Sequence, residues 1–175
     1  MKLSTRELTV FAMLGALMYA SKMLMEVAPN VHLLSVFIVA FTVVYRKKAL
    51  YPIYIYVLLN GLFCGFATWW IPYLYIWTVL WAVVMLLPTK MPRKLKPIVY
   101  MIVCSAHGFL FGTLYAPAQA LLYGLNFKSM IAWIIAGLPW DFVHGVSNFI
   151  CGLLIMPIIS ILTKLENYTA YHNEV

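Results

Sequence analysis

Charged residues are scarce in this chain of 175 residues. They make up 10% of the sequence, whereas 65% of the residues are hydrophobic and the mean hydropathy is +0.92. A soluble domain has about 25% charged residues and close to half apolar residues. The scarcity of charge therefore excludes an ordinary soluble protein, and the apolar excess excludes a disordered chain. The composition indicates a single membrane domain over residues 1–175.

Cysteine is scarce as well, with three residues set far apart in apolar runs. Cys64, Cys104 and Cys151 form no Cys-x-x-Cys pair, and an odd number cannot complete a disulfide framework. A small protein held together by disulfides is therefore excluded. We expect the three side chains to be buried as small hydrophobic groups.

Three common enzymatic motifs are absent from the sequence. There is no GxxxxGK followed by Ser or Thr for nucleotide phosphates, no HExxH for zinc and no GxSxG for a serine nucleophile. We therefore expect no catalytic residues, no cofactor and no metal site. A protein of this kind that moves a solute with ATP needs a separate subunit to hydrolyse the ATP.

Long apolar runs are what the sequence has in abundance. Backbone polar groups in lipid need internal partners, so only helices and closed barrels span membranes. These runs lack the strict alternation of barrel strands, which predicts an all-α integral membrane protein. Because about 20 residues cross the hydrocarbon core, we expect a bundle of six transmembrane helices near residues 7–25, 31–45, 49–68, 71–88, 97–115 and 139–163.

A further apolar stretch, residues 129–138, lies just before Pro139. It is too short to cross a membrane alone, and proline interrupts the hydrogen bonding of a continuous helix. We expect this stretch to form a lid helix or the entry turn of the sixth span.

Basic residues are concentrated on one side of the predicted spans. Ten of the 12 Lys and Arg residues lie there: Lys2, Arg6, Arg46, Lys47, Lys48, Lys90, Arg93, Lys94, Lys96 and Lys164. The positive-inside rule then places the N- and C-termini in the cytoplasm. The net charge of +7 is thus a topology signal, with membrane lipid rather than nucleic acid as its partner. No convincing A-x-A cleavage site follows Arg6, so we expect the N-terminal segment to be retained.

Polar residues in the last predicted span form a pattern. Asp141, His144 and Asn148 are spaced i, i+3 and i+7, which places them on one face of a helix. Ionisable groups at membrane depth are costly and are functional-site hypotheses by default. Ligand contact and an interhelical hydrogen-bond network both explain His144 and Asn148. Asp141 also fits a cap at the helix start behind Pro139.

Two further polar groups lie near the outer end of the first span. Lys22 and Glu26 are spaced i, i+4 and fit a local ion pair, snorkelling to the interface or contact with a ligand. The loop of residues 26–32, which contains Asn30 and His32, lies on the same side. We expect this loop to close over a bound ligand.

Trp77 in the fourth span and His107 in the fifth are expected to face the last span. Trp77 fits either the wall of a pocket for a flat ligand or core packing. The predicted substrate-binding set is therefore Lys22, Glu26, His32, Trp77, His107, Asp141, His144 and Asn148.

Small residues form a stripe along the first span. Ala12, Ala16 and Ala20 recur every four residues, with Gly15 beside them. Such stripes let helices approach closely in lipid. The stripe serves internal packing if it faces inward, and docking of another membrane protein if it faces outward.

These features together resemble the substrate-binding S-components of energy-coupling factor (ECF) transporters. The resemblance covers the size, the six spans, the cytoplasmic termini and the motif Ala12-x-x-x-Ala16. It also covers a last span that opens Leu-Pro-Trp-Asp141-Phe-Val-His144-Gly-Val-Ser-Asn148. It implies a bacterial plasma-membrane subunit that binds a vitamin or similar small organic micronutrient for ATP-driven uptake. The implied partners are two ATPase subunits and a transmembrane coupling protein. The coupling protein would contact Ala12, Ala16 and Ala20.

Two alternatives remain open. One is a polytopic membrane enzyme that uses Asp141, His144 and His107 as acid–base or metal residues. The other is a non-catalytic membrane assembly subunit. Release of a product would favour the enzyme, and copurifying partners without saturable small-molecule binding would favour the assembly subunit.

Overall fold

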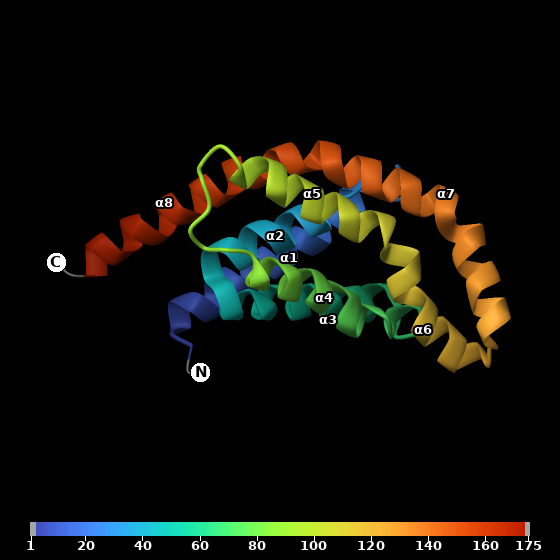
Figure 1. The fold of residues 1–175 in the computed structure, drawn as a ribbon. Helices are drawn as coiled ribbons and strands as arrows, with labels where there is room; N and C mark the ends of the chain where they lie inside the picture. Colours follow the sequence, from blue (N-terminus) through green and yellow to red (C-terminus); the bar gives the residue numbers. More distant parts are fainter. Residues whose placement is uncertain (1–2, 174–175) are drawn as a thin grey trace.

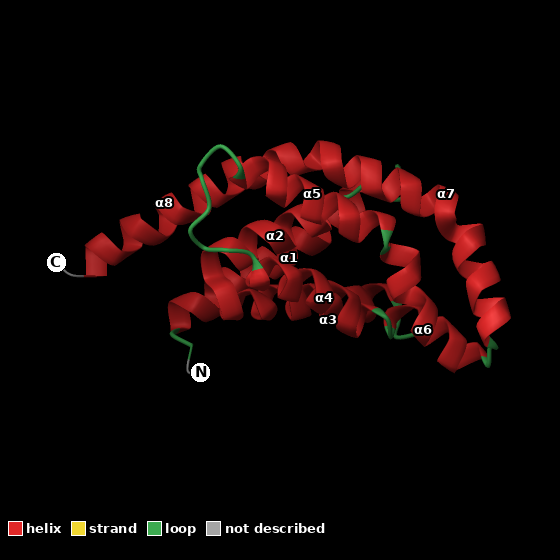
Figure 2. Cartoon of the chain, in the orientation of Figure 1, coloured by secondary structure: helices red, strands yellow, loops and turns green. Residues whose placement is uncertain are grey.

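Helices account for nearly all of the chain. The computed structural model describes residues 3–173, so Lys2 lies outside the described residues. The α-helices are α1 (Thr5–Met25), α2 (Leu34–Tyr45), α3 (Leu50–Cys64), α4 (Tyr73–Leu86), α5 (Lys96–Phe109), α6 (Phe111–Tyr123), α7 (Phe127–Cys151) and α8 (Ile155–Asn173). Short 3-10 helices are η1 (Arg46–Ala49), η2 (Thr68–Trp70) and η3 (Gly152–Leu154). Residues 3–173 contain no strand, which confirms the all-α class (Figure 2).

Four helical stretches of the described chain are long and apolar enough to cross a membrane. They are Thr5–Met25, Thr68–Leu86, Lys96–Tyr123 and Phe127–Tyr168. These match four of the six predicted spans. The other two are shorter, because α2 has 12 residues and α3 has 15. At 1.5 Å per residue, α2 is about 18 Å long, which is less than the hydrocarbon thickness of about 30 Å.

Several helix boundaries differ from the predicted spans. The second helix begins at Leu34 rather than at residue 31. The third ends at Cys64, because Gly65 takes a φ of 92°, which L residues rarely adopt. The fifth bends at Leu110 and continues as α6 to Tyr123, beyond the predicted end at residue 115.

The last predicted span starts earlier than expected. Helix α7 begins at Phe127, where the Asn126 side chain accepts a hydrogen bond of 2.9 Å from the Ser129 N–H. Residues 129–138 are therefore the first part of α7, and the predictions of a lid helix or an entry turn were wrong. Pro139 lies inside the helix and favours a bend there. Figure 1 shows α7 curving around one end of the molecule to meet α6.

Helix α2 lies at the centre of the bundle. Every residue from Leu34 to Thr42 is buried, and a helix that is apolar on all sides is expected to be enclosed by others. The helices around it include α4, α5, α7 and α8. The short helix α2 therefore lies at the centre of the bundle, where other helices rather than lipid surround it.

Glycines bring α5 and α7 into close contact. A Cβ atom on Gly108 would lie 2.9 Å from the backbone N and Cα of Gly145, so no side chain fits at this position. The Ser105 hydroxyl donates a hydrogen bond of 2.9 Å to the Gly145 carbonyl oxygen. These contacts fix the inward face of α7 against α5.

The two termini lie at the same end of the bundle (Figure 1). Helix η1 and the basic loop between α4 and α5 lie at this end too. An ion pair of 2.9 Å between Arg6 and Glu166 joins α1 to α8, and a pair between Glu7 and Lys48 joins α1 to η1. Most basic residues of the described chain are therefore gathered at one end of the fold, and Lys22 and Lys128 are the exceptions.

We expect Gly108→Ala to destabilise the protein. Its new methyl group would meet backbone atoms of α7, which cannot rotate away, and overpacking of this kind costs about 1–3 kcal/mol. The melting temperature of the detergent-solubilised protein should fall by several degrees. Gly137→Ala is the control, because its Cβ would have nothing within 4 Å and alanine favours a helix. Equal melting temperatures for both variants would contradict the close contact.

Candidate functional site

Three histidines and two aromatic residues gather around one point inside the bundle. His32 precedes α2, Trp77 lies in α4, His107 in α5, Phe111 begins α6 and His144 lies in α7. The ring centroid of His144 lies 4.6 Å from that of His32 and 4.9 Å from that of Phe111. The Trp77 centroid lies 5.7 Å from those of His107 and Phe111. We refer to these five residues as the ring cluster.

Polar atoms of the ring cluster are buried without hydrogen-bond partners. They are His32 Nδ1, Trp77 Nε1, His107 Nδ1 and His144 Nε2. Trp77, His107 and His144 are only 1%, 6% and 2% exposed. Each such atom costs about 1–3 kcal/mol, and native proteins keep few of them. Four in one cluster indicate a place where a ligand completes the hydrogen bonds.

The cluster contains both donors and acceptors. His107 Nε2 lies 3.2 Å from the Ile76 carbonyl oxygen, which only accepts, so Nε2 carries the proton. In a neutral imidazole this leaves His107 Nδ1 as an acceptor, whereas Trp77 Nε1 is a donor. Burial lowers the pKa of His32 to about 4, with smaller contributions from His107 and Lys22. His32, in the loop outside the helices, is therefore neutral at pH 7.

Asn148 extends the site one helical turn beyond His144. Its side-chain nitrogen donates to Ser35 Oγ at 3.1 Å and to the Cys104 carbonyl oxygen at 3.2 Å. The amide is therefore held by α2 and α5, and its Oδ1 is a buried acceptor without a partner. Asn148 therefore takes part in the interhelical network, which is one of the two alternatives that the sequence left open.

The loop of residues 26–33, which we refer to as the cover loop, lies against α7. The Ser147 hydroxyl, which has one hydrogen to donate, lies 2.8 Å from the Asn30 carbonyl oxygen and 3.0 Å from that of His144, and the shorter of the two contacts joins it to the loop. Asn30 has a φ of 61°, a left-handed conformation that asparagine tolerates better than most residues. Its neighbour His32 packs on His144. The cover loop thus occupies the position in which a closed gate was expected.

Lys22 and Glu26 form a local ion pair. Lys22 Nζ lies 3.1 Å from Glu26 Oε1, with the two side chains 22% and 58% exposed. Lys22 Nζ also lies 3.9 Å from Cys64 Sγ. Cys64 is exposed at the end of α3 and Cys151 is half-buried, so the expectation that all three cysteines are buried is confirmed for Cys104 alone. The structure thus shows the local ion pair that was one of the expected arrangements, at the end of α1, where the cover loop begins.

Asp141, His144 and Asn148 are all buried, as their shared face predicts. However, Asp141 does not lie in a first turn, because α7 begins at Phe127. Its carboxylate oxygens accept hydrogen bonds of 3.0 and 3.1 Å from the Gly112 N–H. Asp141 thus supports the start of α6, next to the bend between α5 and α6, instead of capping its own helix.

Sequence reasoning missed two residues of this region. Phe111 touches three members of the ring cluster, and Ser147 holds the cover loop. Helical spacing contained a signal for both, since Phe111 is four residues after His107 and Ser147 is three after His144. The bend at Leu110 was not predicted, so Phe111 was not placed beside His107.

The ring cluster and its surroundings define an all-helical protein, with helices fit to cross a membrane and a buried site of mixed polarity. No family model matches the chain, and neither a curated protein nor a solved structure is detectably similar to it. Among the described residues, no group of three or more His, Cys, Asp or Glu side chains is placed to hold a metal ion.

We expect Ser147→Ala to loosen the cover loop. Losing a neutral hydrogen bond costs about 0.5–1.5 kcal/mol, which corresponds to up to about tenfold faster local opening. Hydrogen exchange measured by mass spectrometry should therefore rise in residues 26–33. Ser105→Ala is the matched control, because it removes a serine hydrogen bond between α5 and α7. Exchange in the cover loop that is the same in both variants would show that Ser147 does not hold it.

Proposed function

We propose that the protein is the substrate-binding subunit of an ATP-driven importer of the ECF type, an S-component for a vitamin or similar small organic micronutrient. The observation that carries this proposal is the set of buried, unpaired polar atoms in the ring cluster. A binding subunit needs a preformed, mostly apolar site with a few convergent polar groups. The ring cluster, with Asn148 beside it, has this composition.

The ligand that suits the site is flat, neutral and polar at its edge. Trp77, Phe111 and the imidazoles supply ring faces for stacking. Trp77 Nε1 donates, while His107 Nδ1 and Asn148 Oδ1 accept. A heteroaromatic ring that carries both N–H groups and acceptor atoms satisfies all of these requirements. The cover loop then excludes water and slows release.

The proposed topology has six spans and both termini in the cytoplasm of a bacterial cell. The spans are α1, α2, α3, α4, the bent pair α5–α6, and α7 continued by α8. The gathering of both termini with the basic residues at one end of the bundle supports this orientation (Figure 1). The short α2 is enclosed by other helices, so it does not need the length of a lipid-facing span.

The proposed docking surface for the coupling protein is the outward face of α1. Ala12, Ala16 and Ala20 are exposed, whereas Gly15 is buried. A Cβ on Gly15 would lie 2.5 Å from Ile55 of α3, so the glycine serves internal packing and the alanines remain open to a partner. Two ATPase subunits bound to the coupling protein would supply the ATP hydrolysis.

We expect protein purified from its host to retain its ligand. Mass spectrometry of small molecules released by heat should identify one species in a fixed ratio to protein. His144→Ala and Asn148→Ala should each reduce its amount, up to about tenfold, because a lost hydrogen bond costs about 0.5–1.5 kcal/mol. Asn167→Ala, at an exposed position of α8, is the control for Asn148→Ala. Unchanged retention in both site variants would contradict the proposed site.

We expect Ala16→Trp to abolish ATP-dependent uptake without weakening ligand binding. The indole would hold a partner helix away from α1, while the ring cluster lies on other elements. Leu121→Trp is the control, because Leu121 is a large side chain that is 87% exposed on α6, outside the face of α1. Uptake in vesicles that contain the complete transporter measures the effect. Normal uptake by Ala16→Trp would exclude this face as the docking surface.

A further inference from the structure

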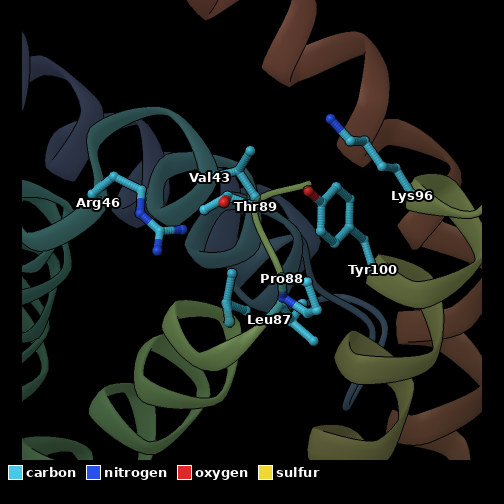
Figure 3. Close-up of a pocket in the computed structure, with 8 residues that line it drawn as sticks. Val43, Arg46, Leu87, Pro88, Thr89, Lys96 and Tyr100 are labelled. Atoms are coloured by element: carbon cyan, nitrogen blue, oxygen red, sulfur yellow. The ribbon is translucent and has the colours of Figure 1, made fainter. Parts of the chain in front are cut away.

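A second site lies at the end of the bundle that carries the termini. A pocket of about 210 Å³ opens between the ends of α2 and α4 and the start of α5, lined by Val43, Arg46, Val84, Leu87, Pro88, Thr89, Lys96 and Tyr100. Figure 3 shows Arg46 on one side of the pocket and Tyr100 and Lys96 on the other, with Leu87 and Pro88 between them. We refer to it as the basic pocket. It is separate from the ring cluster, with which it shares no residue.

The basic pocket has two cationic residues and no acidic one in its lining. Among the described residues the ion pairs are Arg6–Glu166, Lys22–Glu26 and Glu7–Lys48, so neither Arg46 nor Lys96 takes part in one. Arg46 Nη2 donates one hydrogen bond of 3.2 Å to the Met85 carbonyl oxygen. The other N–H groups of this guanidinium remain for a bound anion. The Tyr100 and Thr89 hydroxyl groups add neutral donors.

The backbone at Arg46 is strained. Its φ is 52° and its ψ is −121°, a combination that residues other than glycine rarely adopt. The Trp81 indole donates a hydrogen bond of 3.1 Å to the Arg46 carbonyl oxygen, and the Met85 carbonyl holds the guanidinium. Such strain persists where the surroundings enforce it, and it clusters at functional sites. Here the strained residue is an arginine that lines a pocket.

Three exposed apolar residues lie next to lining residues of the basic pocket in the sequence, and we refer to them as the apolar rim. Leu86 precedes Leu87, while Leu95 and Ile98 lie within two residues of Lys96, and the three are 85%, 49% and 54% exposed. A ligand with a phosphate group and hydrocarbon chains would satisfy both parts of this surface. Arginine binds phosphate oxygens through paired N–H groups, and the flexible stem of lysine reaches a nearby charge.

We propose that the basic pocket binds the phosphate headgroup of an anionic membrane lipid. Arg46 and Lys96 hold the phosphate oxygens, while the acyl chains lie along the apolar rim. The bound lipid thus joins the ends of α2, α4 and α5. This site does not depend on the proposed transport function, because it uses none of the residues of the ring cluster or of the alanine stripe.

Native mass spectrometry of the full-length protein in detergent tests this proposal. The protein is titrated with phosphatidylglycerol, with phosphatidylcholine of the same acyl chains, and with inorganic phosphate. We expect one phosphatidylglycerol to bind preferentially, and Arg46→Gln and Lys96→Gln to weaken it about tenfold each, as for a lost hydrogen bond between charged groups. Lys47→Gln and Lys94→Gln remove the same charge at exposed neighbouring positions and should change binding less than about twofold.

The outcomes separate the possible sources of the phosphate. Preferential lipid binding that is lost in the Arg46 and Lys96 variants supports the headgroup site. Binding of inorganic phosphate alone, with the same residue dependence, would overturn the lipid assignment and identify a site for free phosphate. Equal losses of lipid binding in all four variants would show that binding depends on overall charge, and this would overturn the proposed site. Lys96→Gln lies at the partly exposed rim, so it decides the matter if Arg46→Gln does not fold.

Discussion

Hydrogen bonding of polar atoms inside an apolar bundle is the constraint on which this structure depends. With 65% hydrophobic residues, the chain has few polar groups to pair with one another. Where pairs form, they join elements: Asp141 with the start of α6, Asn148 with α2 and α5, and Ser147 with the cover loop. Where they do not form, the unpaired atoms are concentrated in the ring cluster. Asn148 belongs to both groups, because its amide nitrogen is paired and its Oδ1 is not.

The packing of α5 against α7 keeps the ring cluster in place. Gly108 and Gly145 let the two backbones touch, and His107 and His144 adjoin these glycines in the sequence. The bend at Leu110 then turns Phe111 toward His144. Because interiors are close-packed, small changes at these glycines would move the imidazoles by amounts that matter for hydrogen bonding. The site is thus formed by helix contacts, and His32 of the cover loop packs against it.

Much of this arrangement could be predicted from the sequence. Hydropathy gave the helical class, and helical spacing placed Asp141, His144 and Asn148 on one buried face. The partners of these residues could not be predicted, because they depend on how distant helices meet. Asp141 pairs with Gly112 of α6, in a helix that begins at Phe127 and carries Pro139 inside it. A sequence pattern indicates a helix break at a proline. In the structure, packing of α7 along α6 keeps the helix continuous through Pro139.

We propose that imidazole nitrogens of the ring cluster bind the ligand. Nitrogen NMR of protein labelled in its histidine imidazoles tests this directly, with spectra of the protein before and after its ligand is removed. Imidazole signals report protonation and hydrogen bonding of each ring nitrogen. We expect the signals of His107 and His144 to shift when the ligand leaves, and His144→Ala to remove one of the responding signals. Identical imidazole spectra in the two states would contradict it.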